Sequence, residues 1–253
     1  CCMFKMYCMK KSIVGLLLLV FMAPCVCKSF AAERKKKNVK EETNVAKETK
    51  YEKLMKKAGR ETASGEFLSL HKIGGKLYVE LPFKYCGRDL LIASTTSESS
   101  NSRLAMVGYK TLDPLHVRFI KMDSTIVLQN VNAMMEGDKE LEIAIKRNYM
   151  DTFYKKYPIA AYNNDSTSVV IDMTEMFIGD EPALKPVEER YSILTVNSNL
   201  RPNFASLGKI KAFEDNVMIE SYMTYDYTLS FFGTEVQKNE ITTKVNRTIL
   251  LLP

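Results

Sequence analysis

The segment Leu70-His-Lys-Ile-Gly-Gly-Lys-Leu-Tyr-Val-Glu-Leu-Pro82 decides the fold class of this chain. Apolar residues recur on both sides of Gly74-Gly75, and after the glycines they alternate with polar ones, as in a strand with one buried face. A glycine pair between such runs is typical of a two-residue hairpin, because the favoured turns require positive φ. Pro82 ends the second strand. The segment therefore predicts an antiparallel β-hairpin.

Similar patterns continue along the chain. A third strand is expected at 89–96, and Asp123-Ser124 predicts another hairpin between strands at 116–121 and 125–131. Further strands are expected at 169–171, 193–196, 209–213, 217–225, 227–232 and 242–252. Residues 51–58 predict a short amphipathic helix that ends at Gly59.

A single long helix is predicted over 138–155. Leu141, Ile145, Tyr149 and Phe153 recur at steps of four and share one helical face. Acidic residues open the segment and basic residues close it, which suits the helix dipole. Pro158 is expected to stop the helix. The predicted fold class is thus α+β and β-rich.

These elements suggest four parts. Residues 1–31 form an upstream extension and signal peptide, and residues 32–50 form a charged linker. Residues 51–102 form a small N-terminal β module, and 103–253 form a larger antiparallel β module with the helix 138–155. The apolar run 248–253 reads as an unpaired strand, so the second module is expected to be truncated before a further domain.

The N-terminal segment has the pattern of an export signal. Met9-Lys-Lys precedes an apolar run from Ile13 to Ala23, and small residues at Ser29 and Ala31 predict cleavage after Ala31. The run is shorter than the ~20 residues that a membrane span needs. A lipid anchor on Cys25 or Cys27 is the competing interpretation. Either reading places the protein outside the cytoplasm: periplasmic, outer-membrane-associated or extracellular.

Charge and cysteine content exclude several classes of function. The net charge is +6, but residues 61–253 carry 21 basic and 25 acidic residues, so the part expected to fold gives no nucleic-acid footprint. Five of the six cysteines precede residue 28, which leaves Cys86 without a disulfide partner. His71 and His116 are 45 residues apart, and each is expected to be a structural strand histidine, His71 at the surface.

Two sets of short strings carry a resemblance to a known family. The first set is Tyr51-Glu-Lys-Leu-Met, Gly65-Glu-Phe, Lys76-Leu-Tyr-Val-Glu-Leu-Pro82 and Gly87-Arg-Asp-Leu-Leu-Ile92. The second set is Val117-Arg-Phe119, Tyr157-Pro-Ile-Ala160, Val169-Val-Ile-Asp172 and Met176-Phe-Ile-Gly-Asp180. Through these strings the chain resembles the N-terminal part of the secreted zinc-dependent metalloproteases of Bacteroidetes and related bacteria. In that family two modules of unknown function precede a met-zincin domain with a His-Glu-x-x-His helix, a string that this sequence lacks.

The resemblance implies the non-catalytic N-terminal region of an exported zinc-dependent metallopeptidase. Its partners would be the protein's own C-terminal catalytic domain and a peptide or protein substrate. Zinc would bind in that missing domain, so no catalytic, cofactor-binding or metal-ligating residue is predicted in this chain. The alternative is a stand-alone exported or surface-anchored β-rich protein that binds glycans or peptides.

Several other residues are candidate sites. The acids Asp172, Glu175, Asp180 and Glu181 fit a capping box and a turn better than a calcium loop. Cys86 is expected to be an idle thiol. Asp123-Ser-Thr125 and Asp165-Ser-Thr167 resemble Bacteroidetes O-glycosylation acceptors or are simply turn chemistry. Asn164 and Asn246 match the N-glycosylation pattern, which is discounted in a bacterial setting. The aromatic residues Tyr222, Tyr225, Tyr227, Phe231 and Phe232 form either a binding platform or core.

Overall fold

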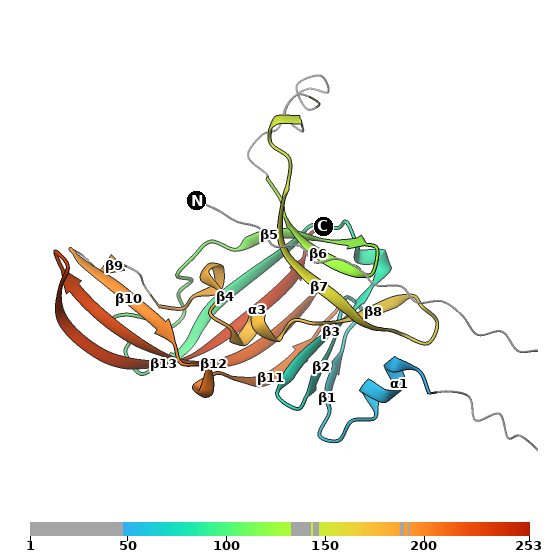
Figure 1. The fold of residues 1–253 in the computed structure, drawn as a ribbon, viewed down its shortest axis with the longest axis horizontal. Coiled ribbons are helices and arrows are strands. Elements are labelled where there is room, and N and C mark those ends of the chain that lie inside the picture. The colour runs from blue at the N-terminus through green and yellow to red at the C-terminus, as the bar shows by residue number, and fades with distance from the viewer. Residues whose placement is uncertain (1–47, 133–142, 144–146, 188–189, 192) are drawn as a thin grey trace, which may run out of the picture. The chain divides into compact units, whose positions relative to one another are not determined.

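The computed structural model describes residues 48–132, 143, 147–187, 190–191 and 193–253 (Figure 1). The helical elements are α1 (Lys50–Met55), η1 (Phe83–Tyr85), α3 (Thr174–Ile178), η2 (Pro182–Leu184) and η3 (Pro202–Phe204). The strands are β1 (Glu61–Ser64), β2 (Ser69–Ile73), β3 (Lys76–Pro82), β4 (Leu90–Ser99), β5 (Leu115–Met122), β6 (Thr125–Asn130), β7 (Thr152–Tyr162), β8 (Ser168–Asp172), β9 (Arg190–Tyr191), β10 (Leu194–Leu200), β11 (Ser206–Ala212), β12 (Asn216–Phe231) and β13 (Thr234–Leu251).

The strands pair antiparallel in the order β1-β2-β3-β8-β7-β6-β5-β4-β13-β12-β10-β9, and β11 adds to β12 (Figure 1). This confirms the β-rich, antiparallel prediction. The two-module description is not confirmed, because strands from before and after residue 103 share the sheet. Strand β3 pairs with β8, and β4 pairs with both β5 and β13.

The predicted hairpins are confirmed. Gly74 and Gly75 join β2 to β3 with φ of 58° and 79°, as a primed two-residue turn requires. Asp123, at φ 49°, joins β5 to β6. The strands expected at 217–225 and 227–232 are a single strand, β12, which pairs with β13 along its whole length.

The predicted helix 138–155 is wrong at its C-terminal end. Residues 152–155 belong to β7, which pairs with β6 over 152–158 and with β8 over 159–162. Pro158 therefore does not stop a helix; it lies where β7 changes partner, a place where a missing N–H is tolerated. Arg147 and Asn148 are helical, while 138–142 and 144–146 lie outside the described residues.

The apolar C-terminal run is not an unpaired strand. Ile249 pairs with Ile92 of β4 on one side and with Val217 of β12 on the other. Its side chain is fully buried. The apolar character of this run follows from its position inside the sheet, where both neighbours are strands.

The main core lies inside the curved sheet and includes α3. Alternate residues of β3 and β8 point inward, and they pack with Met176 and Phe177 of α3. The two ends of the sheet approach each other, because β11 contacts β1 and β2. At Gly65 an added Cβ would lie 2.3 Å from the carbonyl oxygen of Phe213, so only glycine allows this approach.

Two smaller clusters complete the packing. Leu54 of α1 packs with Ile73, Ala161 and Val170 on the outer face of β2, β3, β8 and β7. The capping box of Thr49 and Glu52 fixes the start of this helix. The other cluster lies along the distal half of the β12–β13 hairpin. In the part of the chain that the structure describes, no helix is long and apolar enough to cross a membrane.

Candidate functional site

A connected polar group is centred on Glu80, on the face of the sheet that α1 covers. His71 Nε2 lies 3.2 Å from one carboxylate oxygen, and the Tyr51 hydroxyl donates to the same oxygen at 3.0 Å. Ser168 Oγ donates to the other oxygen at 2.5 Å. On the far side of the imidazole, Thr62 Oγ1 lies 3.1 Å from His71 Nδ1. We call these five residues the Glu80 cluster.

Strand alternation explains why these side chains meet. In β3 the residues Leu77, Val79 and Leu81 point into the core, so Glu80 points to the outer face. The register pairs Thr62 with His71 across β1 and β2. It also pairs Glu80 with Val170, which lies two residues from Ser168 and therefore on the same face of β8. Tyr51 reaches the carboxylate from α1. The cluster therefore ties one helix to four strands.

Ionised Glu80 is favoured by its partners. Burial alone would raise the pKa of this carboxyl, but hydrogen bonds from His71, Ser168 and Tyr51 outweigh it, and the pKa is lowered. Burial, together with the hydrogen bond to Glu80, raises the pKa of Tyr51 to about 12. Glu80 is thus a carboxylate at neutral pH and accepts three hydrogen bonds.

The geometry does not match a nucleophile triad. In such a triad histidine lies between the hydroxyl and the acid and takes the hydroxyl proton. Here the imidazole of His71 does lie between the Thr62 hydroxyl and the Glu80 carboxylate, but the ring nitrogens are exchanged, with Nδ1 facing the hydroxyl and Nε2 facing the acid. The Ser168 hydroxyl contacts the carboxylate directly and not the histidine. His71 and Ser168 are 5% and 2% exposed, so neither presents an atom to a substrate in solution. The cluster is suited to holding α1 and the strands together.

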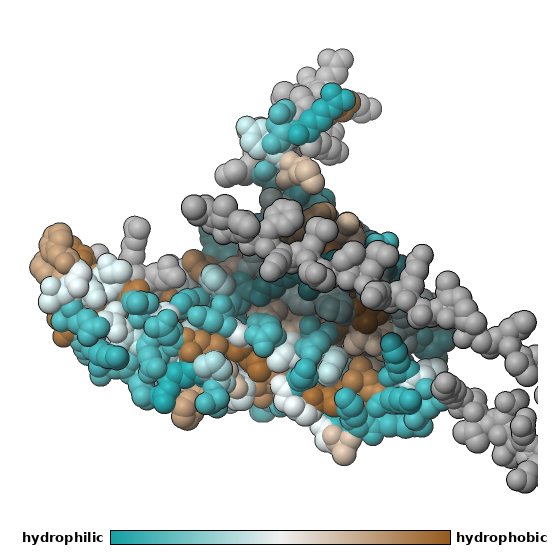
Figure 2. All heavy atoms as spheres, in the orientation of Figure 1, coloured by the Kyte–Doolittle hydropathy of each residue, from teal (hydrophilic) through white to brown (hydrophobic). Residues whose placement is uncertain are grey.

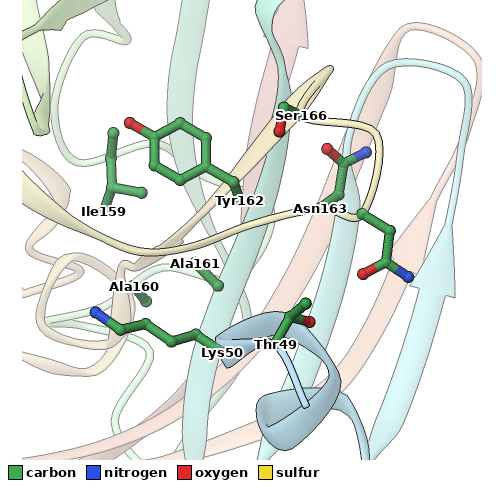
Figure 3. A pocket seen from close by; sticks show the side chains of 9 residues that line it. Thr49, Lys50, Ile159, Ala160, Ala161, Tyr162, Asn163 and Ser166 are labelled. Carbon is green, nitrogen blue, oxygen red and sulfur yellow. The ribbon is translucent and has the colours of Figure 1, made fainter. Parts of the chain in front are cut away.

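A pocket of about 340 Å³ lies between the start of α1 and the β7–β8 turn (Figure 3). Two of its lining residues, Thr49 and Lys50, directly precede Tyr51 of the Glu80 cluster. Its lining is Thr49, Lys50, Ile159, Ala160, Ala161, Tyr162, Asn163, Asn164 and Ser166. Lys50 is the one charged side chain in this lining, and no carboxylate, histidine or cysteine lines it. The pocket offers hydrogen-bonding groups but no acid–base pair.

His116 belongs to a different charged group. Its Nε2 lies 3.5 Å from Asp89 Oδ1, and Arg118 forms a bidentate pair with the same carboxylate. A second oxygen contact joins Arg118 to Asp151 at 3.3 Å. The hydrogen bond from Arg118 holds the pKa of Asp89 below its usual range. This half-buried ion network links the residue before β4, strand β5 and the residue that precedes β7.

Among the residues that the structure describes, Arg247 and Glu181 are charged side chains in buried positions. Arg247 of β13 is fully buried and donates to the carbonyl oxygens of Phe177 and, at 3.1 Å, Leu184. These hydrogen bonds satisfy one main-chain carbonyl near the end of α3 and one in η2. Burial lowers the pKa of Arg247 to about 10. Glu181, whose side chain is buried, pairs with Lys155 and accepts from the Tyr154 hydroxyl.

The acids singled out in the sequence do not form one site. Asp172 contacts Lys76 and Thr174, Asp180 lies 3.8 Å from Lys185, and Glu181 is buried elsewhere. Within the described ranges no three metal-ligating side chains come together. The predicted capping box is wrong, since α3 begins after Met173 with no side-chain cap, and Asp172 accepts from the Thr174 amide.

The remaining candidate residues have varied positions. His71 is in a strand, as predicted, but it is buried and not at the surface. Cys86 is a free, half-buried thiol, and burial raises its pKa, which agrees with an idle thiol. Asp123 and Asp165 lie in exposed hairpin turns, where glycosylation of the neighbouring hydroxyls stays a prediction. Asn246 lies within β13, between β4 and β12.

The aromatic residues of β12 do not share one surface. Tyr225 and Tyr227 are fully buried in the distal cluster, so a continuous binding platform is wrong. Tyr222 points to the other face and lines a pocket of about 310 Å³ with Glu98 and Lys244. Phe231 and Phe232 stand at the hairpin tip and are exposed. The period-two alternation within β12 separates these rings.

Sequence reasoning missed Glu80 and Arg247, and it placed Glu181 in a turn without predicting that its side chain is buried. For Arg247 a signal existed, because Val245 and Ile249 flank it at a spacing of two and predict an inward-facing position. For Glu80 the alternation of β3 predicted an outer face but not the partners on β2, β8 and α1. Those partners depend on long-range pairing.

Comparison with known proteins places part of the chain in a family. No curated protein and no solved structure matches the chain. Residues 110–253 match the family described as "Domain of unknown function (DUF5117)". The matched part runs from the loop before β5 to the end of β13 and covers more than half of the chain. The chain therefore belongs to the DUF5117 family.

Proposed function

We propose that this chain is the non-catalytic N-terminal region of an exported zinc-dependent metallopeptidase, and that it supports a catalytic domain beyond residue 253. Peptide hydrolysis would then belong to that domain, where zinc would activate water. The proposal rests first on the resemblance described in the sequence analysis. It rests also on the family match of residues 110–253, which includes all the strings of the second set, from Val117 to Asp180.

The observation that carries the proposal is how the polar side chains are used. Glu80 accepts from three donors, Arg247 binds main-chain carbonyls, and Glu181 pairs with Lys155. Each of these groups, Glu80 half-buried and the other two buried, joins elements of the structure. Such engagement suits a rigid scaffold, because a catalytic acid or base needs a free lone pair or proton near a substrate.

The test uses the native protein. An affinity tag is placed after the predicted cleavage site, at Ala32, and the product is purified from the source bacterium. We expect a polypeptide well above 28.9 kDa, with about one zinc ion bound and with chelator-sensitive peptidase activity. A zinc-free product of 28.9 kDa or less would contradict the proposal; glycan or peptide binding by that product would favour the alternative function.

We propose also that the chain is exported, on the pattern of residues 9–31. Cell fractionation of the same tagged strain tests this. The product is expected in the periplasmic, outer-membrane or extracellular fraction, and its release by detergent alone would favour the acylated form. Recovery in the cytoplasm would contradict export.

A further inference from the structure

The tip of the β12–β13 hairpin carries an exposed apolar knob. Strand β12 ends at Phe231, which pairs with Thr234, and Phe232-Gly233 form the two-residue turn. Phe232 is 92% exposed, and Val236, the extra residue of a bulge in β13, is 62% exposed. Ile193, before β10, is 76% exposed. Thr195 pairs with Ser230, so the turn before β10 that holds Ile193 and the turn that holds Phe232 lie at the same end of the paired strands. We call Ile193, Phe231, Phe232 and Val236 the apolar tip.

The figures show the same arrangement. In Figure 1 the end of the β12–β13 hairpin lies beside β9 and β10, far along the sheet from β11. In Figure 2 hydrophobic residues gather at that end of the view, next to a mainly hydrophilic stretch of the hairpin. The tip is thus a local apolar patch and not a continuation of the core.

The backbone at the tip suits a different residue. Phe232 has φ of 46° and Gly233 has φ of 82°, the signs of a type I′ turn. Asparagine, aspartate and glycine favour the first position, as Gly74 and Asp123 show in the other hairpins of this chain. A phenylalanine in the left-handed region is unfavourable. Its ring contacts Phe231 edge to face at 4.6 Å, but it is otherwise open to solvent. Folding therefore does not explain this residue.

We propose that the apolar tip inserts into a lipid surface, at the boundary between headgroups and acyl chains. The exposed area is on the order of 400–500 Å², judged from the size of such side chains. That is less than the ~800 Å² per partner that a stable protein interface buries. A convex apolar knob of this size can insert into a lipid layer without a complementary pocket, because the acyl chains adapt to its shape. Insertion removes its aromatic rings and branched side chains from water.

Charge and hydrogen bonding agree with this occupant. The charged residues near the tip have mixed signs: Glu235, Lys238 and Glu240 follow it on β13, and Asp226 precedes it on β12. No basic excess points to an anionic partner, so the contact rests on apolar area. The ladder continues to the Phe231–Thr234 pair, so main-chain groups next to the turn are already paired, as insertion requires.

The experiment uses tryptophan as a reporter, since the chain has none. The full chain is prepared as Phe232→Trp and, separately, as Val236→Trp, each with a single indole at the tip. Phe213→Trp is the matched control, because Phe213 is exposed and lies beside Asn216 at the opposite end of β12. The two ends of β12 are separated by roughly 50 Å along the strand, at the usual rise per residue.

Each variant is mixed with phosphatidylcholine vesicles, with and without brominated acyl chains. We expect both tip reporters to shift to shorter wavelength and to lose most of their emission in brominated vesicles, with the control unchanged. This comparison isolates the tip from any binding by the apolar run Ile13–Ala23. Tip reporters that stay unquenched overturn the proposal, even if the chain sediments with vesicles. A shift that depends on protein concentration and not on lipid assigns the tip to a second copy and also overturns it.

Discussion

Replacing Glu80 with alanine tests the structural role of the Glu80 cluster. The change leaves His71 and Ser168, both buried, without their shared acceptor, while the Tyr51 hydroxyl can turn toward water. An unsatisfied buried group costs about 1–3 kcal/mol, so two of them lower the free energy of unfolding by about 4 kcal/mol. That is a large fraction of the 5–15 kcal/mol typical of a domain.

The assay is urea unfolding of the full chain at pH 7, followed by far-UV circular dichroism. Glu66→Ala is the matched control, because Glu66 is exposed and its nearest cation, Lys84, is 3.9 Å away. Its expected cost is under about 0.5 kcal/mol. If Glu80→Ala lowers the free energy of unfolding no more than the control does, the Glu80 cluster does not help to hold α1 and the strands together.

The same cluster gives a pH dependence with a defined sign. The pKa of Glu80 is lowered from 4.5 in the folded protein, so its ionised form stabilises the fold fully above about pH 4.5. That contribution is lost as pH falls through the lowered folded pKa. The stability difference between wild type and Glu80→Gln should therefore be largest near pH 7 and should shrink toward pH 3. A difference that is constant with pH would contradict the assignment of the lowered pKa.

Three further substitutions test other parts of the account. Gly65→Ala should destabilise the chain by about 2 kcal/mol or more, because the new Cβ meets the main chain of Phe213; an effect as small as that of exposed Ser64→Ala would show that β1 does not approach β11. Phe232→Asn should raise the free energy of unfolding by about 1 kcal/mol, since asparagine suits positive φ; a lower urea midpoint would contradict the strain argument. Arg247→Lys keeps the charge but not the two-pronged contact with main-chain carbonyls, so thermal unfolding should show a loss of about 2–4 kcal/mol; a variant as stable as wild type would argue against those contacts.

Local signals explain which parts of the fold were predictable. Gly74, Gly75 and Asp123 are residue types that adopt positive φ in tight turns, and each has a positive φ in the structure. Both hairpins could therefore be predicted from a few residues. The spacing of Tyr149 and Phe153 is compatible with a helix, but Phe153 instead pairs with Gln129 in β6. Tertiary pairing overrides local pattern there, because β7 bridges β6 and β8.

Long-range pairing also explains what the sequence did not reveal about the site. The partners of Glu80 come from β2, β8 and α1, and no local pattern identifies them. Arg247 was accessible in principle, since its neighbours at a spacing of two are apolar. The division into two modules was not confirmed, because the pairing of β4 with β13 joins residues about 150 positions apart.

The proposed role as the N-terminal region of a metallopeptidase is best tested by the nucleotide sequence that follows the codon for Pro253 in the genome of the source organism. We expect an open frame that continues into a domain with a His-Glu-x-x-His string and a further zinc ligand downstream. A stop codon immediately after Pro253 would contradict the role proposed here and would favour a stand-alone binding protein.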